Sequence, residues 1–240
     1  MLPDYAELHC CTNFSFLRGA SHAEELVARA AELGYAALAI TDACSLAGVV
    51  RAHVAAKVAA LKLIVGSEIT LADGMKLVLL ARNRAGYGNL AALITLGRRR
   101  AAKADQPAGR RTPRSGGPEQ REGWGKAPHF RLSRNDLDWG VPDCLCLWLA
   151  TPDATPADAD WLAARFPGRC WIAYERFLQP DDAERLAHLR ALGLPSGLPL
   201  VAAGDVHMHA RARRPVQDAL TALRLKTTVD AAGHALFPNG

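Results

Sequence analysis

Histidine and carboxylate side chains follow the short apolar runs of this sequence, and these groups are common ligands of catalytic metal ions. His9 stands near the start of the chain, Asp42 and Glu68 come next, and Asp205 and His207 stand near its end. Each lies at or just beyond an apolar run of the kind that forms a buried strand. Several such groups in one place could hold divalent cations that polarise a phosphoester and activate water. These residue types therefore indicate a metal site.

The elements needed to bring these side chains together are predicted by an alternation of strand-like and helical patterns. Strands are expected at residues 5–10, 36–41, 63–71, 76–82, 143–149, 170–174 and 199–203. Helices are expected at residues 22–33, 45–60, 86–97, 157–166, 181–193 and 213–225. Such an alternation favours a parallel α/β barrel or a doubly wound sheet. The carboxyl ends of parallel strands share one face, so the candidate ligands should converge there, with His9 within about 12 Å of His207.

Two of the expected helices carry clear signals where they begin. Ser21 is predicted to be the N-cap of the first helix, with Glu24 as its capping-box partner. Thr155 is predicted to cap the fourth helix, with Pro156 at its first position.

The composition is that of a globular protein with a sizeable core. The chain has 240 residues, half of them hydrophobic, which suits one large α/β domain or two small ones. No apolar run reaches about 18 residues, and the start of the chain lacks the features of a signal peptide. A cytoplasmic protein with no membrane contact is expected. The six cysteines are predicted to be buried free thiols: Cys10, Cys11, Cys44, Cys144, Cys146 and Cys170.

The basic character of the chain is concentrated in residues 98–134. This segment contains 11 Lys and Arg residues against three acidic residues, whereas the whole chain has a net charge of only +5. It is rich in Pro and Gly and poor in apolar residues, so residues 100–128 are expected to be a disordered, protease-sensitive loop insertion. A solvated linker is one interpretation. Weak contact with nucleic-acid phosphates is the other, and its candidates are Arg98, Arg99, Arg100, Arg110 and Arg111.

The order of several motifs resembles a known family. The sequence reads ELHCCTNFSFLRGASH near its start, then LKLIVGSEITL, LVLLARNRAGYGNLAALIT and GLPLVAAGDVHMHARARRPVQDALTALRLKTTV. These motifs resemble, in the same order, the N-terminal region of bacterial C-family DNA polymerases. NFSFLRGASH and CLCLWL are most similar to the error-prone branch, which acts in damage-induced mutagenesis. The resemblance implies a polymerase and histidinol phosphatase (PHP) domain, which is a distorted seven-stranded parallel (β/α) barrel.

The first metal motifs of the PHP family are only partly present. His9 matches the first His of the family's His-x-His motif, but Cys11 stands at the second position. Asp42 is retained in the Thr-Asp-His motif, whose His is replaced by Ala43. Glu68 matches the family's Glu after the Val-Gly pair. The resemblance thus implies His9, Asp42 and Glu68 as ligands, with Cys11 as a possible soft ligand.

The later motifs are also mixed. Asp205 and His207 preserve the closing Asp-x-His motif. Arg18 and Lys76 stand where the family usually has a carboxylate or His, and their charge opposes that of a metal ion. Either cation could instead pair with Glu68 or Asp205 and hold the pocket together without a metal. A metal-free pocket, a single Zn²⁺ or Mn²⁺ ion, and a trinuclear centre all stay open.

Two functions from different classes follow from the resemblance. The first is a structural scaffold within an error-prone DNA polymerase for translesion synthesis, whose polymerase core would use Mg²⁺. That core, DNA, and other replication or mutagenesis proteins would then be the partners. The second is an autonomous metal-dependent phosphoesterase. A nucleic-acid-binding module, resting on the basic segment alone, is a third reading.

The chain is expected to divide into four parts. Residues 1–97 and 135–225 would form the PHP barrel, interrupted by the largely disordered basic insertion at 98–134. Residues 226–240 would begin a linker toward an absent polymerase core, so the chain alone is expected to extend no primer and to hydrolyse phosphoesters weakly or not at all.

Overall fold

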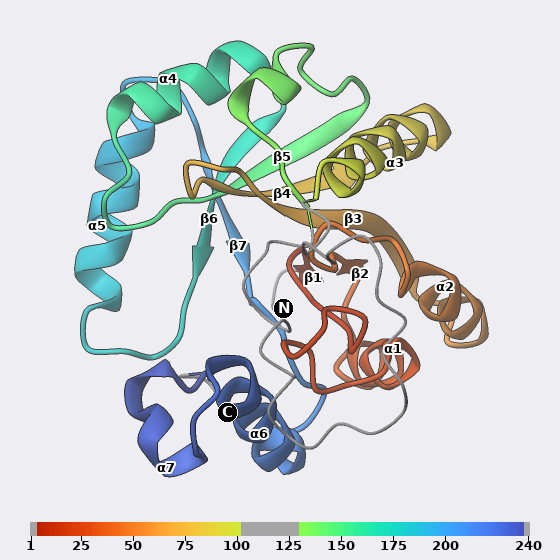
Figure 1. Ribbon diagram of the computed structural model, residues 1–240. Coiled ribbons are helices and arrows are strands. Elements are labelled where there is room, and N and C mark those ends of the chain that lie inside the picture. The colour runs from red at the N-terminus through yellow and green to blue at the C-terminus, as the bar shows by residue number, and fades with distance from the viewer. Residues whose placement is uncertain (1–3, 102–129, 238–240) are drawn as a thin grey trace, which may run out of the picture.

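A single seven-stranded sheet with helices packed around it forms the body of the protein. The computed structural model describes residues 4–101 and 130–237 (Figure 1). The strands are β1 (Ala6–Glu7), β2 (Ala37–Ile40), β3 (Lys62–Thr70), β4 (Lys76–Ala81), β5 (Cys144–Leu149), β6 (Cys170–Glu175) and β7 (Leu200–Ala203). The helices are α1 (Ala23–Glu32), α2 (Val49–Val58), α3 (Arg84–Arg99), α4 (Pro156–Arg165), α5 (Asp182–Gly193), α6 (Arg214–Leu225) and α7 (Val229–Ala232). The seven strands and the six expected helices are confirmed, and α7 is an addition.

The sheet follows the chain order from β1 to β7 and nearly closes into a barrel. Beyond the short β1, Cys10 pairs with Val206 in a parallel bridge, which joins the first and last parts of the sheet. The buried carboxylate of Glu7 strengthens this seam, because it accepts hydrogen bonds from the backbone N–H groups of His9 (2.9 Å) and Gly204 (2.8 Å). The seven-stranded barrel-like α/β fold expected from the sequence is therefore confirmed.

The expectation that every strand is parallel is wrong at β4. This strand runs antiparallel to both β3 and β5, whereas the other neighbouring pairs are parallel. The cause is the connection between β3 and β4, which consists only of Leu71–Met75 and turns at Gly74 with a φ of 93°. A parallel pair needs a crossover of a dozen or more residues, so this connection allows only a hairpin.

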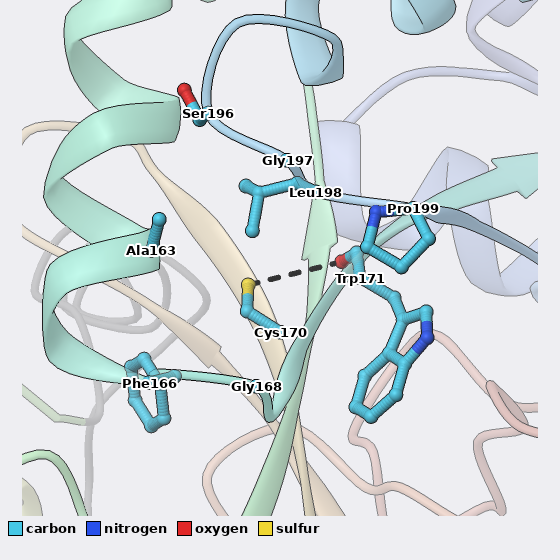
Figure 2. Close-up of a pocket in the computed structure, with 9 residues that line it drawn as sticks. All are labelled: Ala163, Phe166, Gly168, Cys170, Trp171, Ser196, Gly197, Leu198 and Pro199. Atoms are coloured by element: carbon cyan, nitrogen blue, oxygen red, sulfur yellow. Dashed lines mark hydrogen bonds between the residues drawn. The ribbon is translucent and has the colours of Figure 1, made fainter.

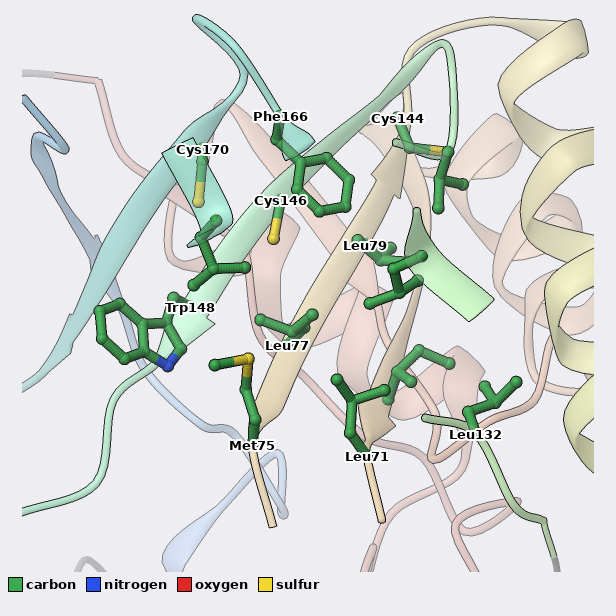
Figure 3. Packing of buried hydrophobic residues seen from close by; sticks show 14 of the residues in the cluster. Leu71, Met75, Leu77, Leu79, Leu132, Cys144, Cys146, Trp148, Phe166 and Cys170 are labelled. Atoms are coloured by element: carbon green, nitrogen blue, oxygen red, sulfur yellow. The ribbon is translucent and has the colours of Figure 1, made fainter. Parts of the chain in front are cut away.

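Alternation along the strands divides the core between the two faces of the sheet. On β4, Leu77 and Leu79 pack into the large cluster beneath the helices (Figure 3), while Val78 and Leu80 fill the barrel interior. A third cluster lies between β2 and the helices α1 and α2. All six cysteines are buried and free, as predicted.

The predicted start of α1 is wrong by one residue. His22 is the N-cap, and the carboxylate of Glu25 accepts a hydrogen bond from its backbone N–H at 2.8 Å. The Ser21 hydroxyl is not free to cap the helix, since it accepts the backbone N–H of His209 at 2.9 Å. The predicted start of α4 is confirmed, with Thr155 as N-cap and Pro156 as the first residue.

The described ends of the basic segment are packed. The backbone N–H of Arg131 donates to the carbonyl of Gly97 at 2.9 Å, and Leu132 is 1% exposed within the core. The predicted disorder of residues 100–128 falls almost entirely outside the described residues. Among the residues that are described, no helix is long and apolar enough to span a bilayer.

Two glycines on α3 provide a matched test of how this helix docks. A Cβ added at Gly86 would overlap the backbone carbonyl of Asp143, whereas one added at Gly88 would meet no atom within 4 Å. We expect Gly86→Ala to lower the free energy of unfolding by about 1–3 kcal/mol through overpacking. Gly88→Ala should instead raise it by up to about 1 kcal/mol, because alanine favours a helix. Urea unfolding of both variants checks this, and equal effects would contradict the docking geometry.

Candidate functional site

His9 lies at the centre of a buried cluster of carboxylates at the carboxyl ends of the strands. Its Nδ1 is 2.6 Å from Glu175 Oε1 and 3.5 Å from Asp205 Oδ1. Its Nε2 is 3.1 Å from Glu68 Oε2. His9 is only 2% exposed. The predicted convergence of residues from both ends of the chain is therefore confirmed for this group.

His207 extends the cluster toward α6. Its Nε2 is 2.9 Å from Asp205 Oδ1, and its Nδ1 is 3.3 Å from Gln217 Nε2. Cys11 lies beside this strand end, where its backbone N–H donates to the carbonyl of Val206 at 2.9 Å. Asp205 has a φ of 47°, a left-handed backbone conformation that is costly for a residue with a side chain.

Arg18 neutralises the cluster from one side. Its Nη1 and Nη2 donate to Glu68 Oε1 (2.7 Å) and Oε2 (2.8 Å), which makes a two-pronged ion pair. The Glu68 side chain is 4% exposed. Although burial acts against ionisation, hydrogen bonds from His9 and Arg18 hold the pKa of Glu68 well below its usual range. Of the two carboxylates with which Arg18 was expected to pair, Glu68 and Asp205, the structure shows Glu68.

Two buried histidines of this cluster have raised pKa values. Burial opposes protonation of His9, but hydrogen bonds to Glu175 and Glu68 hold its pKa well above the ordinary value. Burial likewise opposes protonation of His207, while Cys11 and Asp205 raise its pKa to about 10. A protonated His207 needs an acceptor at Nδ1. The buried Oε1 of Gln217, which has no partner among the described residues, would supply it if the amide were turned over.

The protonation of His207 predicts a pH dependence of stability. Because its folded pKa is raised from 6.5 to about 10, its contribution is complete below pH 6.5 and is lost as the pH rises toward 10. We expect the wild-type protein to lose roughly 1.5–3 kcal/mol more of its unfolding free energy over this range than His207→Gln, the value of a hydrogen bond to a charged group. Urea unfolding at the two pH values, with a chelator present, measures the difference. Parallel pH profiles would contradict this charge state.

The remaining predicted ligand positions lie around the cluster. Asp42 is fully buried in a separate network, accepting hydrogen bonds from the backbone of Thr12 (2.8 Å) and the Ser15 hydroxyl (2.7 Å). Ala43 pairs with Glu68 in a parallel bridge, which places it beside the cluster.

Lys76 is exposed at the rim of the same sheet face as Glu68. It pairs with Thr70, two residues beyond Glu68 on β3, and residues two apart on a strand point to one face.

Glu175 and Gln217 were missed in the sequence. Glu175 is the last residue of β6, so it carries the same signal as the other ligands, a polar side chain that ends an apolar strand. Gln217 carries no such signal, because it lies within the polar part of α6 and only the fold brings it to His207.

Three side chains could hold one metal ion. One ligand atom each from His9, Glu175 and Asp205 lies within 4.8 Å of the others. Imidazole and carboxylate donors at this spacing fit a single Zn²⁺ or Mn²⁺ ion in chemical type. Glu68 also borders His9, but both of its oxygens are already bound by Arg18.

Three of the five arginines predicted to contact nucleic acid lie among the described residues. Arg98 donates to the backbone carbonyl of Cys44 at 2.8 Å, and Arg100 pairs with Asp136 at 2.6 Å. Arg99 is exposed at the end of α3. Arg110 and Arg111 lie outside the described residues.

A separate cavity lies at the other end of the barrel. It has a volume of about 350 Å³ and is bordered by Cys170, Trp171, Leu198 and Pro199 (Figure 2). Cys170 is the first residue of β6, and Pro199 directly precedes β7. This cavity therefore opens at the amino ends of the strands, away from the ionisable cluster.

Comparison with known proteins gives consistent relationships. Residues 7–119 match the PHP domain model. The chain is 61% identical over 244 residues to an error-prone DNA polymerase of Dechloromonas aromatica, covering 100% of this chain and 21% of that protein. It is 51% identical to an error-prone DNA polymerase of Pseudomonas aeruginosa, covering 98% of this chain and 20% of that protein. The chain thus spans about a fifth of the length of these relatives.

Solved structures share the fold. A candidate metal-dependent phosphoesterase from Bifidobacterium adolescentis aligns with a TM-score of 0.57 at 17% identity, covering 86% of this chain and 88% of that one. An amidohydrolase from Chromobacterium violaceum, solved with bound sulfate and no metal, aligns with a TM-score of 0.57 at 19% identity, covering 85% and 87%. At this level of identity, the likeness concerns the fold alone.

Proposed function

This chain belongs to the PHP-domain family found in error-prone DNA polymerases, and on that premise we propose that it acts as a structural scaffold rather than as a hydrolase. Its polymerase relatives are about five times as long, so the scaffold would support a polymerase core. That core would carry out translesion synthesis in the cytoplasm with Mg²⁺, on DNA and alongside other mutagenesis proteins. The described part of the chain, residues 4–101 and 130–237, would then have mainly a structural role.

The ion pair between Arg18 and Glu68 carries this proposal. A hydrolytic centre with several metals needs free anionic ligands to hold cations a few ångströms apart. Here the most buried carboxylate of the cluster is held by a guanidinium instead, at 2.7 and 2.8 Å. Cys11 and Ala43 further reduce the ligand set, since neither is a carboxylate or a histidine. A degenerate site stabilised by charge pairs is the best account of this arrangement.

A metal-dependent phosphoesterase is the second candidate. It is favoured by the spacing of His9, Glu175 and Asp205, whose ligand atoms lie within 4.8 Å. One ion there would supply Lewis-acid activation of a phosphoester. His9, Glu175 and Asp205 would hold the ion, and Arg18 would offer a cation to an anionic substrate.

Metal content and hydrolysis together distinguish the two candidates. The purified chain should contain less than one equivalent of metal by elemental analysis. It should also show no hydrolysis of p-nitrophenyl phosphate above that of Asp205→Asn with Mn²⁺ or Zn²⁺ added. Two or more tightly bound ions per chain, with robust hydrolysis that His207→Ala abolishes, would replace the scaffold by the phosphoesterase.

A further inference from the structure

The last described residue, Phe237, lies directly on the ionisable cluster. Its ring stacks on the imidazole of His207, with ring centres 4.2 Å apart and planes inclined by 21°. The same ring is nearly perpendicular to the ring of Phe177, with ring centres 5.8 Å apart. Phe177 comes two residues after Glu175. Phe237 therefore bridges the two segments that carry cluster residues from β6 and β7.

A segment built from α6 and α7 brings Phe237 to this position. In Figure 1 these helices lie beyond the carboxyl ends of β6 and β7. Gln217 on α6 is 2% exposed and contacts His207 at 3.3 Å, so the segment is tied to the cluster at both of its ends. The guanidinium carbon of Arg185 lies 5.1 Å from the centre of the Phe177 ring. These contacts leave His207 only 7% exposed.

We propose that residues 214–237 form a built-in cover for the cluster, with Phe237 as the residue that closes it. Metal ions, water and phosphate-bearing ligands would then reach His207 only when the cover lifts. An aromatic ring stacked on an imidazole ring is held by this contact, which is lost when the ring moves away. The inference concerns the site of the proposed function, but it holds whether or not that site takes a metal.

Alkylation of the Cys11 thiol can report whether this cover is open. Cys11 is 2% exposed, and its backbone N–H donates to the carbonyl of Val206, the neighbour of His207, at 2.9 Å, so a thiol reagent must enter the cluster to reach it. The other five cysteines are buried too, and they report opening elsewhere. Cys144, Cys146 and Cys170 belong to the large core cluster, while Cys10 packs beneath α1.

The experiment measures the alkylation rate of each cysteine by N-ethylmaleimide and peptide mass spectrometry in the native protein. In Phe237→Ala, the rate at Cys11 should rise by about tenfold, as expected for the loss of one aromatic stacking contact. The rates at Cys144, Cys146 and Cys170 should stay unchanged. Phe237→Leu, which keeps apolar bulk but cannot stack, should give an intermediate rate. Phe16→Ala is the control, because Phe16 is 65% exposed.

Two results would overturn the cover. The first is an unchanged rate at Cys11 in both Phe237 variants. The second is an equal rise at all six cysteines in both variants, since it would make Phe237 a part of the general fold. Neither result depends on metal content or hydrolysis, so failure of the cover is distinguishable from failure of the scaffold proposal.

Discussion

Replacing Arg18 with alanine is expected to lower the free energy of unfolding by about 3–5 kcal/mol, the usual cost of breaking a buried ion pair. The variant leaves the carboxylate of Glu68 buried, with its side chain 4% exposed, and without the guanidinium that binds both of its oxygens. The partial exposure of Arg18, at 25%, places the expected loss toward the lower end of this range. Urea unfolding at neutral pH with a chelator present measures it.

Two comparisons separate this effect from a general loss of charge. Arg29→Ala removes a surface pair, in which Arg29 and Glu32 are 46% and 64% exposed, and should cost no more than about 1 kcal/mol. The double variant Arg18→Met with Glu68→Met should recover most of the stability, since apolar side chains of similar volume often replace a buried pair without loss. A cost below about 1 kcal/mol for Arg18→Ala would mean that the pair does not organise the cluster.

Restoring the missing ligands should convert the cluster into a strong metal site. The variant combines Cys11→His, Ala43→His and Lys76→His with Arg18→Asp. Ala43 is bridged to Glu68, and Lys76 shares its sheet face, so both positions border the cluster. Changes around metal ligands commonly alter affinity by roughly 10–100-fold, so we expect the combined gain in Zn²⁺ or Mn²⁺ affinity to exceed about 100-fold. Calorimetric titration of the metal-free proteins measures the gain.

The control adds Glu68→Gln to the same combined variant. This change keeps the shape of the side chain but removes the carboxylate that the altered residues surround. Most of the gain should then disappear. No gain in the combined variant, with its helical content intact, would show that positions 11, 43 and 76 are not the lost ligand positions.

The secondary structure could be predicted because each element has a local signal. The helix expected at 181–193 is observed as α5 (Asp182–Gly193). Its signal is local, because the periodic apolar residues and the loops at both ends of the helix are neighbours in the sequence. The direction of β4 also had a local signal, the Asp73–Gly74 pair between two apolar runs, which is typical of a hairpin. The regular alternation of strands and helices elsewhere in the chain nevertheless led to the expectation that β4 is parallel to its neighbours.

The site was less predictable because it depends on contacts between distant residues. His9 and Glu175 are 166 positions apart and meet only when the sheet curves around. The positive charge of Arg18 could be recognised as opposed to a metal ion, but charge alone did not decide between Glu68 and Asp205 as its partner. Gln217 and Phe237 could not be recognised, since an amide on a helix and an aromatic ring near the end of the sequence are common in any protein.

The hydrogen bond between Arg131 and Gly97 has a consequence for how this protein can vary. The chain leaves the barrel just after α3 and rejoins it beside the same helix, at a backbone distance of 2.9 Å between donor and acceptor. When the two ends of a connection are held this close, doubling its length costs only about 0.6 kcal/mol of closure entropy. Evolution can therefore lengthen, shorten or rewrite the connection with little effect on the barrel. For the protein engineer, the same junction is a natural place to insert a reporter domain or to open new chain termini.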